Sequence, residues 1–233
     1  MYLCCKYHSM STKPKTTRTK KKKLTREDLI GLYMNAVLEQ GEFPTNVYKF
    51  CKDQKIEESE FYAQFGSFEG LREGIWSQFH HMALGLTQKA RGYTNIGAKD
   101  KLLTYYFTLF ELLTANRSYV LFALDSSAPW QQRMMQLSGL RKGVKAYAKE
   151  LIQDANDQKT LGIFKQPTEL FSEGAWAETV VILKYWMKDN SPGFEQTDAF
   201  IEKSIRAIFD LFETTPLESV LDLGKFLWKE RMA

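Results

Sequence analysis

The chain has 233 residues and a formal net charge of +4, and 44% of its residues are hydrophobic. This length allows a substantial core, in one large domain or in one small and one larger domain. No apolar run approaches the roughly 20 residues that a membrane-spanning helix needs, and three cysteines cannot form a useful disulfide framework. These features exclude an integral membrane protein, argue against secretion and indicate a cytoplasmic protein.

The first segment, residues 1–23, is polar, rich in Lys and Thr and without hydrophobic periodicity, so we expect a disordered arm. Residues 1–26 hold nine of the 32 basic residues and no acid, which leaves 23 basic against 28 acidic residues in the rest. Two interpretations stay open. The arm attracts the phosphates of nucleic acid or anionic lipid, or it is a solvated tail. A translation start at Met1 or at Met10 is compatible with the sequence.

Residues 24–70 contain three short helical patterns. The first covers Arg26–Gln40, with Thr25 as its N-cap and Gly41 as its C-cap. Pro44 is expected to open the second. The apolar faces of the second and third helices contain Val47, Phe50 and Cys51, and Phe61, Tyr62 and Phe65. Because such short helices cannot bury both faces alone, the three predict a helix-turn-helix unit.

Residues 71–233 predict a larger helical domain, which begins inside a fourth helix that Ser67 caps and that runs to about Lys89. The apolar stripe of this helix is expected to contain Leu71, Ile75, Phe79, Met82 and Leu86. Further helices are expected over residues 99–115, 118–124, 127–155, 167–188, 195–214 and 216–232, with connections at 92–97 and 161–167. The predicted fold class is all-α, with nine or ten helices.

Two histidines, His80 and His81, lie on the fourth helix. No further His, Cys or carboxylate stands at the spacing of a zinc site, so we interpret both as packing and surface residues. The sequence also lacks the nucleophile, metalloprotease and phosphate-loop motifs of common enzymes. We therefore predict no metal, no cofactor and no catalytic residue.

Residues 41–71 resemble the DNA-binding unit of the tetracycline-repressor (TetR) family and follow its pattern without a gap. The positions that match in identity or character are Gly41, Thr45, Val47, Phe50, Ile56, Phe61, Tyr62, Phe65, Ser67, Glu69 and Leu71. The departures cluster where DNA would lie. They are Lys55 for the usual turn Gly, Glu57 for Ser, Ser59 and Glu60 for a small polar pair, Gln64 for His, and Phe68 for Lys.

This resemblance implies a dimer that places two recognition helices in successive major grooves. Phosphates would be contacted by Thr45, Asn46 and Tyr62, base edges by Ser59 and Gln64, and the backbone or minor groove by Lys20, Lys21, Lys22 and Lys23. Against DNA binding, Glu57, Glu58 and Glu60 bring negative charge toward the phosphates.

In the TetR family the larger domain binds an effector and forms the dimer. Its aromatic and Met side chains here can line a pocket for a small apolar ligand, or they are simply core. The candidate pocket residues are Tyr106, Phe107, Phe110, Phe122, Trp130, Met134 and Trp176. The resemblance also implies a homodimer through the helices at 167–188 and 195–214, for which the candidate residues are Val180, Leu183, Phe200, Ile201, Ile205 and Phe209.

A second resemblance, over about 25 residues from Trp186, is to the TetR-fold lipid-binding accessory proteins of ubiquinone biosynthesis. The matching residues are Asp189, Ser191, Pro192, Phe194, Thr197 and Phe200. Two functions therefore stay open. The first is a ligand-responsive TetR-like transcriptional regulator that binds duplex DNA as a dimer. The second is a TetR-fold protein that no longer binds DNA specifically and binds an isoprenoid-like lipid or a protein partner.

Overall fold

The computed structural model describes residues 23–124, 129–157 and 166–214, and within these ranges it contains helices and no strand. The α-helices are α1 (Arg26–Gln40), α2 (Val47–Gln54), α3 (Glu58–Tyr62), α4 (Phe68–Lys89), α5 (Ala98–Ala115), α6 (Arg117–Ala123), α7 (Trp130–Gln136), α8 (Ser138–Asp157), α9 (Thr168–Lys188) and α10 (Glu195–Thr214). Two short 3₁₀ turns, η1 (Tyr93–Asn95) and η3 (Pro192–Phe194), join α4 to α5 and α9 to α10. The predicted all-α class is confirmed. The helix predicted at 216–232 lies outside the described residues.

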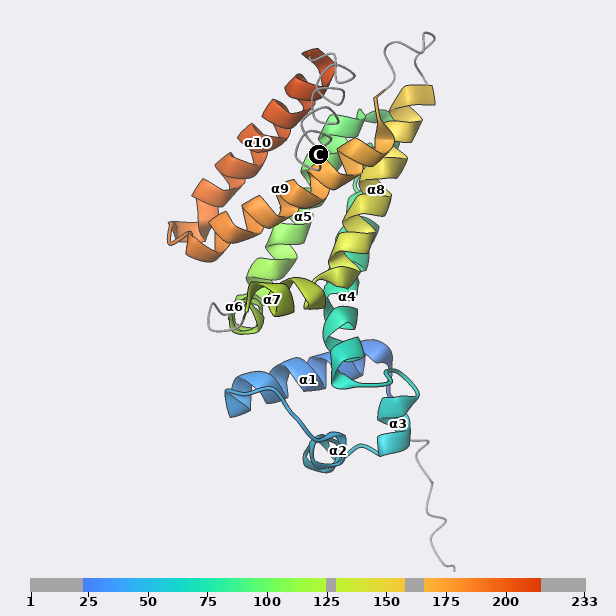
Figure 1. Ribbon diagram of the computed structural model, residues 1–233, viewed down its shortest axis with the longest axis vertical. Coiled ribbons are helices and arrows are strands. Elements are labelled where there is room, and N and C mark those ends of the chain that lie inside the picture. The colour runs from blue at the N-terminus through green and yellow to red at the C-terminus, as the bar shows by residue number, and fades with distance from the viewer. Residues whose placement is uncertain (1–22, 125–128, 158–165, 215–233) are drawn as a thin grey trace, which may run out of the picture.

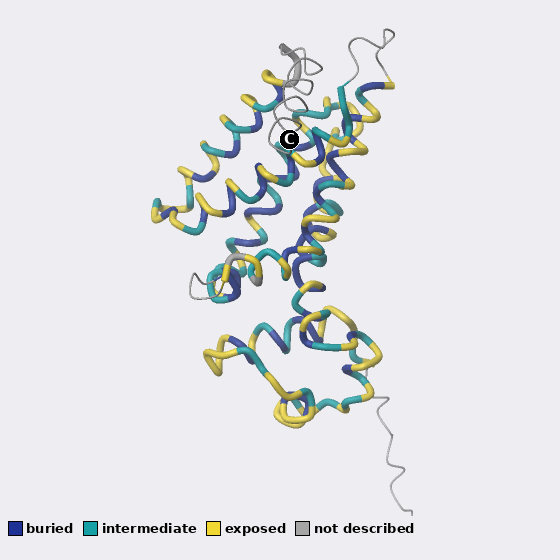
Figure 2. The backbone as a smooth tube through the Cα atoms, viewed as in Figure 1, coloured by how far each residue is buried: buried dark blue, intermediate teal, exposed yellow. Residues whose placement is uncertain are grey.

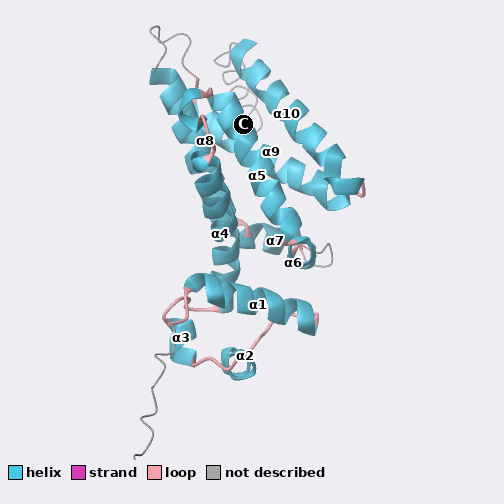
Figure 3. Cartoon of the chain, turned by 180° about the vertical axis from the view of Figure 1, so that it is seen from behind, coloured by secondary structure: helices cyan, strands magenta, loops and turns pink. Residues whose placement is uncertain are grey.

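Helices α1–α3 form a small unit at one end of the molecule, and α4 extends from this unit into the larger domain (Figure 1). There α4 packs against α5 and α8, α9 covers α8, and α10 packs on α5 and α9. Buried residues continue along α4 from the small unit into the larger one (Figure 2). None of the described helices is long and apolar enough to cross a membrane. The view from behind shows the same arrangement, with short loops between most helices (Figure 3).

Three of the predicted helix ends are confirmed by their hydrogen bonds. Thr25 Oγ1 accepts from the Asp28 N–H at 3.1 Å, and Asp28 Oδ2 accepts from the Thr25 N–H at 3.1 Å, which is a capping box. Gly41 ends α1 in the left-handed conformation with φ 68°. Ser67 Oγ accepts from the Gly70 N–H at 3.2 Å and so caps α4. Each end follows from a local side-chain or backbone preference.

Two helix boundaries were predicted wrongly. Pro44 does not open α2, because Asn46 caps that helix and its first residue is Val47. The single helix expected over 127–155 is broken at Leu137 into α7 and α8. Next to this break a Cβ at Gly139 would lie 2.5 Å from the Glu73 carbonyl oxygen, so α8 begins in close contact with the backbone of α4.

The apolar stripe of α4 was predicted correctly only in its first half. Leu71, Ile75 and Phe79 are buried, but Met82 and Leu86 are 44% and 51% exposed. The buried face continues through Ala83 and Thr87 instead. It therefore advances in steps of four residues along the side that α5 and α8 cover.

A hydrogen-bonded pair, His80 and Tyr105, joins α4 to α5 inside the larger domain. His80 Nδ1 lies 2.8 Å from Tyr105 Oη, and both side chains are buried. Gly143 of α8 lies so close that a Cβ there would be 2.3 Å from His80 Cδ2. Burial, with a smaller contribution from neighbouring His81, lowers the pKa of His80 to about 4. No group of metal-ligating side chains is found among the described residues.

A second polar centre, Asp189, holds the joint between α9 and α10. Its carboxylate accepts hydrogen bonds from the backbone N–H and hydroxyl of Ser191, at 2.8 and 2.7 Å, and of Thr197, at 2.9 and 2.6 Å. Burial alone would raise the pKa of this carboxyl, but the four hydrogen bonds outweigh burial and lower it to about 2. Three of the residues that match the ubiquinone accessory proteins, Asp189, Ser191 and Thr197, thus form the hydrogen bonds at the start of α10.

Arg117 of α6 completes this joint from the other side. Its guanidinium lies 4.4 Å from the ring centroid of Trp186 and 4.5 Å from that of Phe194. It donates to the carbonyl oxygens of Trp186, Met187 and Asp189 at 3.0 to 3.3 Å. Arg117 therefore satisfies the last carbonyl groups of α9 and fixes the turn into α10.

We expect acid to destabilise the fold through His80. The folded-state pKa of about 4 lies below the ordinary value of 6.5, so the unfolded chain binds the proton more tightly. This residue's contribution is fully present above pH 6.5 and is lost as the pH falls toward 4, at about 1.4 kcal/mol per pKa unit or roughly 3 kcal/mol in all. Urea unfolding of wild type and His80→Gln between these pH values measures it. His81→Gln, at the exposed neighbour, should leave the pH dependence intact, and an unchanged slope in His80→Gln would contradict the assignment.

Candidate nucleic-acid interface and interdomain cleft

The three-helix unit is held together by four aromatic side chains from four helices. Phe68 of α4 lies 5.5 Å from Tyr33 of α1, 5.6 Å from Phe50 of α2 and 5.4 Å from Phe61 of α3, measured between ring centroids. The contacts with Phe50 and Phe61 are edge-to-face, the geometry that aromatic pairs favour. Phe68 is buried, so the position where the TetR pattern has Lys belongs to the core here.

Helix α2 begins and ends with residues that were expected to face DNA. Asn46 Oδ1 accepts from the Lys49 N–H at 3.0 Å, so this side chain caps the helix. Lys55 ends α2 in the left-handed conformation with φ 57°, and its N–H donates to the Lys52 carbonyl at 3.2 Å. Lys55 thus takes the backbone conformation that the usual turn Gly adopts without strain.

Helix α3 is short and begins with three acids. Glu60 Oε2 accepts from the Glu57 N–H at 3.0 Å, so one of these carboxylates satisfies the start of its own helix. Burial, followed by the charges of Glu58, Glu57 and Glu60, raises the pKa of the Cys51 thiol on α2. The acidic cluster therefore adds to the effect of burial on this thiol. Ser59, predicted to face base edges, is exposed on this helix.

Gln64 follows α3 and binds the start of α1. Its side-chain Nε2 donates to the Leu24 carbonyl at 3.4 Å, and its own carbonyl accepts from Arg26 Nη1 at 3.1 Å. The Arg26 guanidinium also lies 4.0 Å from the ring centroid of Phe65. These contacts place the first described residue, the exposed Lys23, next to the end of α3. Lys20, Lys21 and Lys22 lie outside the described residues.

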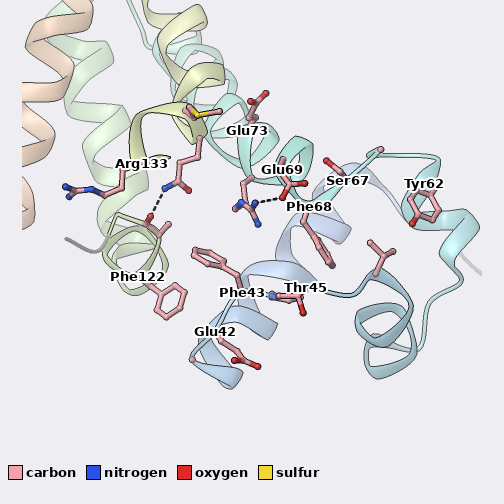
Figure 4. Close-up of a pocket in the computed structure, with 18 residues that line it drawn as sticks. Glu42, Phe43, Thr45, Tyr62, Ser67, Phe68, Glu69, Glu73, Phe122 and Arg133 are labelled. Atoms are coloured by element: carbon pink, nitrogen blue, oxygen red, sulfur yellow. Dashed lines mark hydrogen bonds and ion pairs between the residues drawn. The ribbon is translucent and has the colours of Figure 1, made fainter. Parts of the chain in front are cut away.

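A cleft of about 1030 Å³ separates the three-helix unit from α6 and α7 (Figure 4). Thr45, Tyr62 and Ser67 line it on the side of the three-helix unit. From this same side Phe43, in the loop between α1 and α2, reaches Phe122 of α6 on the opposite side and meets it edge-to-face with 5.0 Å between ring centroids. The structure thus brings two of the predicted phosphate-contacting residues, Thr45 and Tyr62, to one cleft.

The residues predicted to line a ligand pocket do not share one environment. Tyr106 and Phe110 are fully buried, and Tyr106 Oη donates to the Ala175 carbonyl at 2.7 Å. Phe107, Met134 and Trp176 are partly buried and pack against the core. Phe122 lies in the interdomain cleft, and the Trp130 side chain is outside the described part of the chain. The sequence missed Phe43 as a partner of Phe122, although an aromatic residue just before Pro44 in a loop was a usable signal.

The predicted dimer residues are mostly used within one chain. Leu183, Ile201, Ile205 and Phe209 are at most 6% exposed, because α10 packs its apolar face on α5 and α9. Within one chain these four positions are therefore part of the core. Val180 and Phe200 are half-buried, and the Phe200 ring stacks on Tyr185 at 4.5 Å. The apolar side chains that α9 still exposes are Val181 and Tyr185.

Comparison with known proteins agrees with this architecture. Residues 101–227 match the profile of a family described as "Tetracyclin repressor-like, C-terminal domain". Among solved structures the chain is similar to the fatty acid degradation regulator FadR from Bacillus halodurans, with 16% identity and a TM-score of 0.55, over 80% of this chain and 96% of that chain. At this identity the likeness shows the fold. No curated protein matches the chain.

Replacing Lys55 by Gly should stabilise the protein. A side chain in the left-handed region is strained by roughly 1–2 kcal/mol, and the extra chain entropy of Gly offsets about half of this, so we expect a gain near 0.5–1 kcal/mol in unfolding free energy. Chemical denaturation measures it. Lys52→Gly, inside the last turn of α2, is the matched control and should lose about 1 kcal/mol. Destabilisation by both substitutions would show that Lys55 is not strained.

Proposed function

The chain belongs to the tetracyclin repressor-like family, and on that premise we propose that it is a transcriptional regulator rather than an enzyme. It binds duplex DNA as a homodimer, responds to a small apolar ligand and acts in the cytoplasm. The observation that supports DNA binding most is the three-helix unit, whose ring cluster is complete and whose Thr45 and Tyr62 lie along one cleft. Similarity to the fold of a named regulator is consistent with this role.

In this proposal α3 enters the major groove with Ser59 toward the bases, and Tyr62 contacts a phosphate. Tyr62 is 52% exposed, so its side chain is open to such a contact. Asn46 and Gln64 would have to contact DNA while holding their intramolecular hydrogen bonds. Lys23 and the basic residues before it add attraction that does not depend on base sequence.

A second function is favoured by the chemistry of α3. Glu57 and Glu58 stand where DNA phosphates would approach, and Phe68 removes a cation by joining the core. A TetR-fold protein with these features could dispense with specific DNA binding and instead bind an isoprenoid-like lipid or a protein partner. The same experiments distinguish the two functions.

The homodimer of this proposal uses the outer face of α9. Val181 is 48% exposed and Tyr185 is 37% exposed, one helical turn apart. Half-buried Phe200 extends the Tyr185 ring by stacking on it, while half-buried Val180 lies at the edge of this face. These exposed apolar side chains support pairing with the same face of a second copy.

Selection of genomic fragments by the full chain at physiological salt should recover a near-palindromic site. Tyr62→Phe should weaken binding to all sequences by a similar factor, about fivefold for one lost hydrogen bond, because a phosphate contact carries no base information. Tyr185→Phe, which removes a hydroxyl outside the three-helix unit and keeps the ring that stacks on Phe200, is the control and should bind like wild type. Failure to recover any preferred sequence would favour the second function, and a changed sequence preference in Tyr62→Phe would contradict its role.

Glu58→Lys should raise the affinity for non-specific duplex DNA about tenfold or more at low salt, because it replaces repulsion by attraction. It should also steepen the dependence of log affinity on log salt by about 0.9 for each additional phosphate that the protein neutralises. Titration of a labelled duplex at several salt concentrations measures both. Glu39→Lys makes the same charge change at the far end of α1 and should have a smaller effect. Equal effects of the two substitutions would show that α3 does not face DNA.

Sedimentation at micromolar concentration should show a homodimer that Val181→Glu dissociates, since a buried unpaired carboxylate at an interface is strongly unfavourable. Leu86→Glu, at an exposed apolar residue of α4, is the matched control. A monomeric wild type, or a dimer that persists in Val181→Glu and dissociates in Leu86→Glu, would place the interface elsewhere.

A further inference from the structure

Several features of the interdomain cleft have no role in the proposed binding of DNA. Its apolar wall is the pair of rings Phe43 and Phe122, which come from the two sides of the cleft and touch only edge-to-face. Figure 4 shows the two rings next to each other, where the loop after α1 approaches α6. A flat ring can pack on both of them, because aromatic pairs favour offset and edge-to-face geometries. At about 1030 Å³ the cleft has the size of a small-molecule site.

A cation, Arg72 of α4, lies close to both Phe43 and Tyr33. Its guanidinium is 5.4 Å from the ring centroid of Phe43, and its side chain is 21% exposed. Nη1 donates to Tyr33 Oη at 3.3 Å and Nη2 pairs with Glu69 at 2.8 Å. The Glu69 side chain is 73% exposed, and surface ion pairs of this kind contribute little. A ligand carboxylate can therefore replace Glu69 and use the planar donor fork of Arg72.

Gln136 of α7 also lines the cleft, and its buried side-chain Oε1 finds no hydrogen-bond donor among the described residues. The amide is held in place by its other end, since Nε2 donates to the Ala123 carbonyl at 2.6 Å. A fixed, buried and unsatisfied acceptor is unfavourable unless a donor reaches it. A hydroxyl group on a bound molecule would supply that donor.

The other charged residues of the cleft lie at its rim. The side chains of Glu42, Glu73 and Arg133 point away from the Phe43 and Phe122 rings (Figure 4). Arg133 Nη1 donates to the Leu124 carbonyl at 3.4 Å. The Arg72 guanidinium therefore lies over the Phe43 ring, and Gln136 supplies an amide oxygen from α7.

We propose that this cleft binds a small aromatic carboxylic acid that carries a hydroxyl group. The carboxylate pairs with Arg72, the ring packs on Phe43 and Phe122, and the hydroxyl donates to Gln136 Oε1. This site lies apart from the buried Tyr106 and Phe110 of the larger domain, and it does not depend on DNA binding. Because Phe43 is followed by Pro44, Thr45 and the α2 cap Asn46, a ring packed on Phe43 also changes the surroundings of that loop.

Fluorescence titration of the full chain with hydroxynaphthoate tests the site, with naphthol and amidinonaphthol as neutral and cationic probes of the same shape. Wild type should bind hydroxynaphthoate more tightly than either. Arg72→Gln and Phe122→Ala should each weaken this binding about tenfold, and Gln136→Leu about fivefold. Glu69→Gln should strengthen it, because the competing carboxylate is removed. Arg26→Gln is the matched control, since Arg26 also stacks on a Phe ring and donates to a carbonyl, but outside the cleft.

Circular dichroism and thermal melting establish that each variant folds. Arg72→Lys, which keeps the charge and loses the fork, should bind with intermediate affinity. No binding of hydroxynaphthoate at millimolar concentration, equal affinity in Arg72→Gln and wild type, or tighter binding of the cationic probe would each overturn the proposal. Binding without any DNA preference would leave this site intact and contradict the regulator function, so the two proposals fail separately.

Discussion

Helix α4 belongs to two cores at once, and the relation between the two parts of the molecule depends on it. Phe68, its first residue, packs with Tyr33, Phe50 and Phe61 in the three-helix unit. Twelve residues later, about 18 Å along the axis, His80 binds Tyr105 in the larger domain. A continuous hydrogen-bonded helix is stiff over this length, so a shift at one end displaces the other. The contacts of α1 with α6, and of Phe43 with Phe122, then limit the rotation about α4.

Local chemistry made much of the fold predictable from the sequence. Thr25, Gly41 and Ser67 end helices through preferences of single residues, and the structure places all three as expected. The predictions fail where a segment distant in the sequence determines the local structure. Leu137 interrupts a periodic pattern next to Gly139, which meets the backbone of α4. Ile201 and Ile205 form an apolar face that a second subunit could have covered, but α5 and α9 cover it. Periodicity identifies such a face without identifying its partner.

In the candidate site, too, some features could be predicted from the sequence and others could not. The sequence marked position 68 as a departure from the TetR pattern, but only the packing shows that Phe68 enters the ring cluster. It marked the acids of α3 as obstacles to DNA, while the structure uses Glu60 to satisfy the Glu57 N–H. The cleft itself could not be predicted, because Phe43, Arg72 and Gln136 come from segments with no local relation. Replacing Glu60 would therefore have two effects. It would remove a negative charge that repels DNA, and it would remove the hydrogen bond at the start of α3.

Because Gly143 and His80 are in close contact, the residue types that the fold tolerates at these two positions depend on each other. With 2.3 Å between a notional Cβ and the imidazole, alanine at 143 becomes tolerable only when residue 80 shrinks. A smaller residue 80 in turn leaves the Tyr105 hydroxyl without its partner. Natural or laboratory evolution therefore has to change these three positions together or leave them alone. In an alignment of related chains, replacements at positions 80, 105 and 143 should be correlated, because these residues fill the space between α4, α5 and α8.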